Sequence, residues 1–572
     1  MRLRNSLSSC LQTALPSSLH TNMVRRDSKE STRNKKKDWG EMTPEAIQAL
    51  CLANAPRSLL YRHPILRRFY LVIFVLTTLL FLLPFWSLLY LPRSNRPRRS
   101  WTLQRCLRVR WSRRLCGVVA RCEIDYLGRD LNLDLVPMRL THSHPVTIPP
   151  APLYLLQGHP KEMLELLHQS RGSWDPHFIY RVNRAATDVW GAWNSRDEKE
   201  LSKEYGFEAV KAFWFTGEKG APDEKPKPRQ DGDPIMLHFH GGGYLCGTAA
   251  ETDLTSSICK ALVNYSPIHH ILSVDYRLAP VGPWPLPLLD AISAYHYLVK
   301  IEGIAEQDII IGGDSAGGHL AMALTRWLRD EGNHVGLSMP RGVVLMSPWA
   351  DLGFTNAWGA EEYKYNADSD TIDDTFGPFA CSLLLRALPL SILYSSPYLS
   401  PASSTVSATS IFNNFPPTYI VYGGAERLAK STETLYSRIQ LARRAADKVH
   451  VPDRLFASPD AVHDFMIFPW MAREASQVYE DLDKWLRGLL TTDICSPEAA
   501  SKDSLKQSKE ITDQRRLTRQ RTLESFRSHK SPRMCAAPDS GMLELVQDMQ
   551  EEGMSMIEIP KLDLGSTAFA EI

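Results

Sequence analysis

The sequence is poor in the residues that build metal centres and disulfide frameworks. Ten cysteines are spread over 572 residues, and they form no CxxC pair, so neither a zinc ribbon nor a disulfide scaffold is expected. The chain also lacks a large excess of either charge. It contains 66 Lys and Arg and 64 Asp and Glu, which gives a formal net charge of +2. That balance does not indicate a dedicated nucleic-acid binder. A hydrophobic content of 44% excludes collagen-like and wholly disordered chains.

One long stretch without charge stands out against this composition. Residues 69–91 (FYLVIFVLTTLLFLLPFWSLLYL) contain no charged side chain, and about 20 apolar residues suffice to cross the hydrocarbon core of a bilayer as a helix. The stretch predicts a single transmembrane helix, which Pro84 is expected to kink. Its length and its distance from the first residue argue against a cleaved signal peptide. We therefore expect a single-pass membrane protein.

Basic segments lie on both sides of this stretch. Residues 1–68 are basic and rich in serine, which predicts a largely disordered region and leaves open whether Met1 or Met23 is the true start. Residues 93–114 carry nine arginines and no acid, with apolar side chains between them. Such a pattern is typical of a membrane-surface helix, so residues 93–114 are assigned to lipid headgroups, and residues 92–144 are interpreted as a basic juxtamembrane linker. The excess of arginine on this side favours a cytosolic C-terminal part.

Residues 145–490 alternate short apolar runs with helical patterns, which predicts an α/β domain whose parallel sheet is covered on both faces. Cap elements are expected at about 145–200 and 355–412. Blocks of like charge in 491–572 predict a disordered tail. The expected strands are 235–239, 271–275, 308–312, 342–346, 418–422 and 454–457, and the expected helices are 252–264, 286–300, 316–330 and 431–444.

A Gly-x-Ser-x-Gly sequence, GDSAG at 313–317, follows one expected strand and precedes an expected helix. At such a turn the serine sits in a tight elbow at a helix N-terminus. Free backbone N–H groups and the helix dipole there favour a developing oxyanion. Ser315 is therefore the candidate nucleophile.

A glycine-rich segment, HGGGY at 240–244, ends another expected strand. Glycines allow bare backbone to approach a reacting carbonyl. We expect the oxyanion hole to be formed by the HGGG segment and the residue after the serine. The candidate residues are His240, Gly241, Gly242 and Ala316.

A serine nucleophile needs a base, and the base needs a group that fixes its orientation. In this class of fold the chain order is Ser, then acid, then His. His463 follows the last expected strand and is the candidate base, and Glu426 follows the strand at 418–422 and is the candidate acid. Asp460 and Asp464 are competing acids close to the histidine in sequence.

Together, HGGGY (240–244), DYRLAP (275–280), GDSAGG (313–318) and HDF (463–465) resemble the hormone-sensitive-lipase-like branch of the α/β-hydrolases. The resemblance implies an α/β fold with a mostly parallel eight-stranded sheet and a helical cap. It also implies hydrolysis of carboxylic esters without metal or cofactor. Glu426 departs from the pattern, since most relatives have Asp at that point.

The membrane helix ahead of the domain makes the chain similar to arylacetamide deacetylases and fungal steryl acetyl hydrolases of the endoplasmic reticulum. This similarity implies a membrane-anchored esterase or lipase for a small lipophilic ester, such as an acetylated sterol. Those enzymes usually face the lumen, against the orientation that the arginine count favours. Alternatives are a hydrolase of amides or xenobiotics and a non-catalytic scaffold, although the intact Ser315 and His463 argue against the scaffold.

Overall fold

The computed structural model describes nine parts of the chain. The expected disordered tail from residue 492 onward, most of the basic N-terminal region, and most of the expected cap element at 145–200 lie outside the described residues. The described residues are 64–122, 141–152, 155, 206–217, 229–279, 281–356, 366–385, 388–406 and 411–491.

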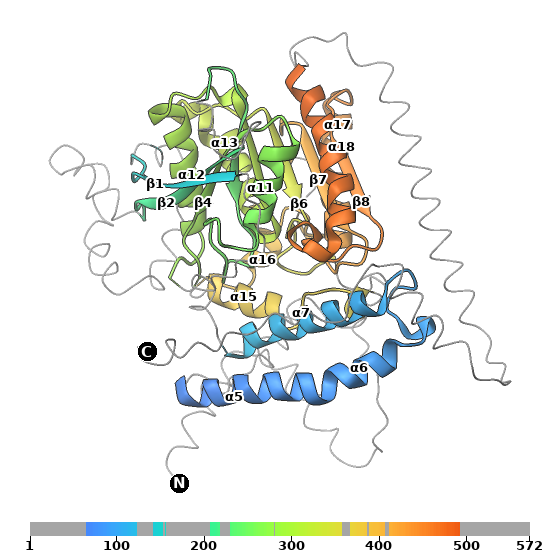
Figure 1. Cartoon of the computed structure of the whole chain (residues 1–572). Helices are drawn as coiled ribbons and strands as arrows, with labels where there is room; N and C mark the ends of the chain where they lie inside the picture. Colours follow the sequence, from blue (N-terminus) through green and yellow to red (C-terminus); the bar gives the residue numbers. More distant parts are fainter. Residues whose placement is uncertain are drawn as a thin grey trace, which may run out of the picture. The chain divides into compact units, whose positions relative to one another are not determined.

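An eight-stranded sheet forms the centre of the described part (Figure 1). Its strands lie in the order β1-β2-β4-β3-β5-β6-β7-β8. The β1–β2 and β2–β4 pairs are antiparallel, and every other pair is parallel. The mostly parallel eight-stranded sheet expected from the resemblance is confirmed. The strands are β1 Thr141–Ile148, β2 Val210–Gly217, β3 Ile235–Phe239, β4 His270–Asp275, β5 Ile309–Asp314, β6 Gly342–Met346, β7 Thr418–Gly423 and β8 Arg454–Ser458.

Helices cover both faces of this sheet, and a separate cluster of buried apolar side chains lies on each face. In β5, Ile309 and Ile311 belong to one cluster and Ile310 to the other, as expected for a strand that is buried on both sides. The first cluster includes side chains of α12 (Leu286–His296), α13 (Ser315–Glu331) and α17 (Ala429–Ala445). The second includes side chains of α11 (Ser256–Tyr265) and α18 (Ala472–Thr491).

The six expected strands are present, with bounds within two residues of the prediction. β1 and β2 were not expected, and β1 places the start of the sheet at Thr141, ahead of the predicted domain start at residue 145. β1 contains Pro145 and several polar side chains, which hide its pattern. Proline is tolerated there because β1 is an edge strand, where a missing N–H removes no ladder hydrogen bond.

The apolar stretch forms a continuous helical segment made of α5 (Pro64–Thr77), the π-helical turn η2 (Thr78–Leu82) and α6 (Leu83–Tyr90). Among the described residues, 68–90 form one helix long and apolar enough to cross a membrane. The π-turn comes directly before Pro84. Proline has no N–H and its ring clashes with the carbonyl four residues earlier, so a widened turn accommodates it.

The expected juxtamembrane linker contains a further helix, α7 (Leu103–Cys122), which packs against the sheet domain. Apolar side chains of this segment enter the same cluster as α11 and α18, namely Trp101, Cys106 and Val109, each 1% exposed. Three arginines pair with acids of the domain: Arg105 with Glu474 (2.8 Å), Arg110 with Asp368 (3.5 Å) and Arg113 with Asp374 (3.5 Å). The assignment of the whole segment to lipid headgroups is therefore corrected, because much of it has a protein partner.

Between β6 and β7, the expected cap element at 355–412 contains two described α-helices, α15 (Phe376–Leu385) and α16 (Ile392–Ser395), and the short 3-10 helix η9 (Asn366–Asp368). α15 lies against α7. α7, which follows the apolar helix, is thus packed against the cap element between β6 and β7.

Candidate active site

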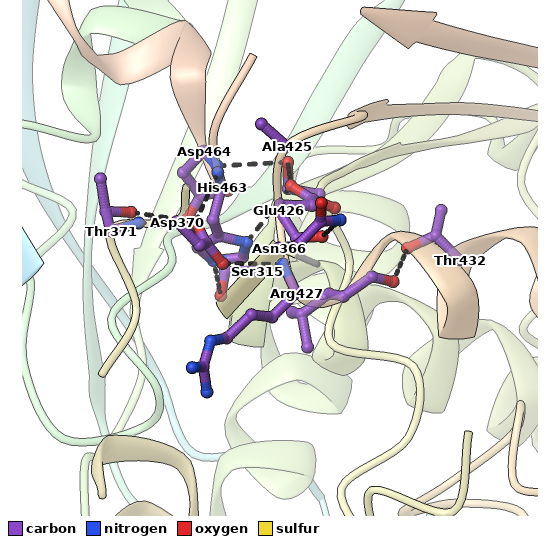
Figure 2. Close-up of polar contacts among 12 residues, drawn as sticks. Ser315, Asn366, Asp370, Thr371, Ala425, Glu426, Arg427, Thr432, His463 and Asp464 are labelled. Atoms are coloured by element: carbon purple, nitrogen blue, oxygen red, sulfur yellow. Dashed lines mark hydrogen bonds and ion pairs between the residues drawn. The ribbon is translucent and has the colours of Figure 1, made fainter. Parts of the chain in front are cut away.

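Ser315 lies in the sharp turn between β5 and α13 (Figure 2). Its backbone φ is +49°, a left-handed value that is strained for a residue with a Cβ. Gly317 allows α13 to start close to β3, because a Cβ at this position would lie 2.0 Å from the carbonyl oxygen of Phe239. The turn places the Ser315 side chain at the N-terminus of α13.

His463 follows β8 and faces the serine. Its Nε2 atom is 2.8 Å from Ser315 Oγ, within hydrogen-bond distance. Both side chains are largely buried, with 7% of Ser315 and 6% of His463 exposed. The structure therefore brings together the candidate nucleophile and the candidate base, which stand 148 residues apart in the chain.

Glu426 follows β7 and lies behind the histidine. Its Oε2 atom is 3.5 Å from His463 Nδ1 and accepts a hydrogen bond of 2.8 Å from Ser347 Oγ. Burial raises the pKa of Glu426, and the neighbouring His463 opposes this effect. Among the three acids considered from the sequence, Glu426 is the one on the Nδ1 side of the imidazole.

The two competing acids lie elsewhere. Asp464 Oδ2 is 3.1 Å from His463 Nε2, the nitrogen that faces the serine. The backbone of Asp464 is left-handed, with a φ of +50°, and its amide donates to Ser347 Oγ at 3.2 Å. The Asp460 carboxylate accepts a hydrogen bond from Ser100 at 2.7 Å. A second buried carboxylate therefore stands beside the reacting face of the histidine.

The charge on His463 is governed by these carboxylates. Burial opposes the charged imidazolium, but the neighbouring Asp464 and Glu426 outweigh it and raise the pKa of His463 well above its usual range. Burial also raises the pKa of Asp464, against the opposing effect of His463. The site is thus arranged to stabilise a protonated histidine.

Asp370, which the sequence reasoning did not single out, joins the two loops of the site. Its Oδ1 accepts from the His463 amide at 3.0 Å, and its Oδ2 accepts from the Arg427 amide at 2.8 Å. The residue is completely buried, and Figure 2 shows it between the two loops. Its sequence surroundings are an acidic run in the expected cap element, and no motif marks it.

The glycine-rich segment at 240–244 was expected to supply amides to an oxyanion hole, and one of these amides has another partner. The amide of Gly241 donates to Asp314 Oδ2 at 2.9 Å, so it is already engaged. The His240 ring stacks on Tyr276 at 4.5 Å, and its Nδ1 donates to the carbonyl oxygen of Gly241 at 2.7 Å. His240 and Gly241 therefore hold the loop together. The backbone hydrogen bonds of the described residues include none donated by the amides of Gly242 and Gly243.

Behind the elbow, His238 and Asp314 form a buried pair, with 3.5 Å between His238 Nε2 and Asp314 Oδ1. Burial disfavours the charge on His238, but the neighbouring Cys259 and Asp314 outweigh it and raise the pKa of His238 to about 10. This pair fixes the carboxylate that holds Gly241. Among the described residues, no group of three or more His, Cys, Asp or Glu side chains is placed to hold a metal ion.

The chain is similar to several known proteins. The α/β hydrolase fold family matches residues 236–466. An esterase of Acinetobacter venetianus is 28% identical over 277 residues, which cover 47% of this chain and 80% of that protein. Steryl acetyl hydrolase 1 of Saccharomyces cerevisiae is 30% identical over 135 residues, 23% of this chain and 30% of that protein. A solved hormone-sensitive lipase from a metagenome library is 28% identical, with a TM-score of 0.39 over 49% of this chain and 82% of that chain.

Proposed function

We propose that this carboxylic ester hydrolase, whose residues 236–466 match the α/β hydrolase fold family, is a membrane-anchored serine esterase of the hormone-sensitive-lipase-like branch with a Ser315–His463–Glu426 triad. One observation carries the proposal: His463 Nε2 lies 2.8 Å from Ser315 Oγ while its Nδ1 faces Glu426 at 3.5 Å. A nucleophile, a base and an orienting acid in this order are the requirements for acyl transfer through a covalent intermediate.

The reaction proceeds in two halves. Ser315 Oγ attacks the ester carbonyl and passes its proton to His463 Nε2, and the histidine then donates that proton to the departing alcohol. Water repeats the sequence on the acyl-enzyme, with His463 again as the base. The raised pKa of His463 supports a histidine that holds a proton between the two transfers.

The tetrahedral oxyanion is held by backbone amides at the elbow. Ala316 is in the first turn of α13, where amides have no partner inside the helix. The Gly241 amide is engaged by Asp314, so we assign the other donors to Gly242 and Gly243. Removing one such donor costs about 10²–10³ in rate.

We propose that the substrate is a small lipophilic ester, such as the acetyl ester of a sterol, delivered from the membrane of the endoplasmic reticulum. The support is the apolar helix at residues 68–90 and the likeness to a relative named steryl acetyl hydrolase. The side chains of this helix that face outward are large and apolar, with Phe81 69% and Leu88 73% exposed. Such a surface suits contact with lipid.

The experiment compares hydrolysis of p-nitrophenyl acetate, p-nitrophenyl butyrate and a sterol acetate in mixed micelles by the full-length wild type and by Ser315→Ala. We expect the wild type to cleave all three and the variant to cleave none. Retained activity in Ser315→Ala would overturn the proposed nucleophile. A wild type that cleaves the short soluble esters far better than any membrane-borne ester would overturn the lipophilic substrate.

A further inference from the structure

The end of the apolar helix is tied to the segment that follows it. Arg96 is 8% exposed, and its guanidinium donates to the carbonyl oxygen of Tyr90 at 3.1 Å and to that of Trp101 at 2.8 Å. The last carbonyls of a helix have no partner inside the helix, so this arginine caps α6 and fixes the course of the chain up to Trp101. We refer to residues 96–101 as the juxtamembrane hook.

One side of the juxtamembrane hook reaches the loop that carries Glu426. Arg98 donates to the carbonyl oxygen of Gly424 at 2.8 Å and to Asn366 Oδ1 at 2.5 Å. Asn366 in turn donates to the carbonyl oxygen of Glu426 at 2.7 Å. The backbone on both sides of Ala425 is thus held by a chain of hydrogen bonds that starts at Arg98.

The other side of the juxtamembrane hook reaches the loop that carries His463. Trp101 is 1% exposed, and its indole Nε1 donates to the carbonyl oxygen of Asp460 at 2.9 Å. Ser100 donates to the carboxylate of the same aspartate at 2.7 Å. Asp460 stands three residues before His463 in the loop after β8.

We propose that the juxtamembrane hook is a positioning element of the catalytic site, with Arg98 holding the Glu426 loop and Trp101 holding the His463 loop. The inference rests on the proposed triad. Both loops end parallel strands and carry one catalytic side chain each, and Asp370 already joins them from within. The hook joins them from outside, so the segment that follows the membrane helix also sets the geometry of acid and base.

The physical reason is the sensitivity of acyl transfer to geometry. A displacement of about 1 Å in a positioned group costs up to about 10²-fold in rate. Glu426 Oε2 is already 3.5 Å from His463 Nδ1, so a further shift of either loop lengthens a distance that is near the limit of a useful contact. We assign no substrate contact to the hook, so we expect kcat to change more than KM.

The test uses the full-length protein in detergent micelles and four variants: Arg98→Ala, Arg98→Lys, Trp101→Phe and Arg444→Ala. Arg444 is an exposed arginine of α17, outside the hook, so Arg444→Ala removes the same charge without altering the hook and serves as the control. Trp101→Phe keeps a buried ring and removes only the Nε1 donor. Wild type and Ser315→Ala are measured alongside on p-nitrophenyl butyrate, with melting temperatures for all.

We expect Arg98→Ala to lower kcat by about tenfold or more with KM within about twofold, while Arg98→Lys recovers part of the loss and Arg444→Ala matches the wild type. Trp101→Phe should lower kcat in the same way at a nearly unchanged melting temperature. Equal losses in Arg98→Ala and Arg444→Ala would overturn the inference, and so would a loss of kcat that is explained by unfolding of the variant. If Ser315→Ala is inactive and Arg98→Ala is fully active, the proposed function is supported and the positioning role of the hook is wrong. If Ser315→Ala stays active, the triad itself fails.

Discussion

At the scale of single residues, the unusual feature is that His463 has a carboxylate on each side of its ring. Glu426 faces Nδ1 at 3.5 Å and Asp464 faces Nε2 at 3.1 Å, and Asp370 holds the backbone amide of the histidine. An acid at Nδ1 orients a catalytic histidine. An acid at Nε2 competes with the serine for the same proton, so it changes the pH range in which the base is free.

We predict that Asp464→Asn shifts the acid limb of the kcat/KM profile to lower pH. The base must be neutral to accept the serine proton, so activity rises as pH passes through the pKa of His463. Asp464 raises that pKa, and its removal lowers it, so the variant stays active at a pH where the wild type has lost activity. The measurement is kcat/KM for p-nitrophenyl acetate from pH 4.5 to 9. An unchanged acid limb would contradict the role of Asp464.

We predict that Glu426→Gln lowers kcat by about 10²–10⁴-fold, since an amide of the same shape no longer stabilises the imidazolium or fixes its tautomer. The hydrogen bond from Ser347 to Oε2 is compatible with an amide oxygen, so the fold should persist. Ser347→Ala is the companion variant, with a smaller loss because only one support of the acid is removed. Stopped-flow or steady-state kcat values check both, and a loss below about threefold in Glu426→Gln would contradict its assignment.

At the scale of elements, the contact between β3 and α13 depends on a missing side chain. A Cβ at Gly317 would lie 2.0 Å from the Phe239 carbonyl oxygen, whereas a Cβ at Gly488 in α18 would meet nothing within 4 Å. Both glycines are in helices, so a Gly→Ala substitution raises helix propensity at both positions. A difference between the two variants therefore reports the steric effect at Gly317. Gly317 therefore allows α13, the helix that begins at Ser315, to pack closely against β3.

We predict that Gly317→Ala destabilises the protein by about 1–3 kcal/mol or more through overpacking and lowers activity because Ser315 starts the displaced helix. Gly488→Ala should be neutral or stabilising by up to about 1 kcal/mol, because alanine is favoured over glycine inside a helix. Thermal unfolding of both variants in the same detergent is the measurement. A Gly317→Ala variant as stable and active as the wild type would show that α13 is not tightly seated.

The sequence predicted the elements with strong local patterns. The six apolar runs became strands, and the positions of Ser315, Glu426 and His463 followed from chain order. The missed strands β1 and β2 pair with each other and with β4, and no local signal distinguished the Pro-containing edge strand β1. The sequence analysis missed Asp370, Ser347 and Arg98. Each of them binds backbone or side chains that are far away in sequence, and such contacts produce no motif with a recognisable spacing.

At the scale of the whole molecule, the chain joins a hydrolase domain to an apolar helix through α7 and the juxtamembrane hook. Side chains that follow the apolar helix, such as Trp101, are part of the same buried cluster as α11 and α18. We infer that the hydrolase begins functionally near Arg96, well before the domain start at residue 145 that the sequence pattern predicted. The proposed membrane anchor and the proposed positioning element are thus neighbouring parts of the chain.

We predict that the double substitution Leu80→Arg and Phe81→Arg releases the protein from membranes. Both side chains are exposed, by 63% and 69%, and an arginine near the centre of a bilayer costs about 2.5–3.5 kcal/mol on insertion scales. Val449→Arg, at a position that is 55% exposed on the hydrolase domain, is the control. Alkaline carbonate extraction followed by centrifugation gives the membrane fraction, and an unchanged pellet for the double variant would contradict the anchor.

Fluorophosphonate labelling of the full-length protein, followed by mass spectrometry of its peptides, tests most directly whether Ser315 is the nucleophile of a serine esterase. We predict one adduct per chain on the peptide that contains Ser315, no adduct in Ser315→Ala, and slow labelling in His463→Ala. Labelling of Ser315→Ala at the wild-type rate would contradict the assignment of Ser315 as the nucleophile. So would a folded wild type that takes no label and hydrolyses neither soluble nor membrane-borne esters.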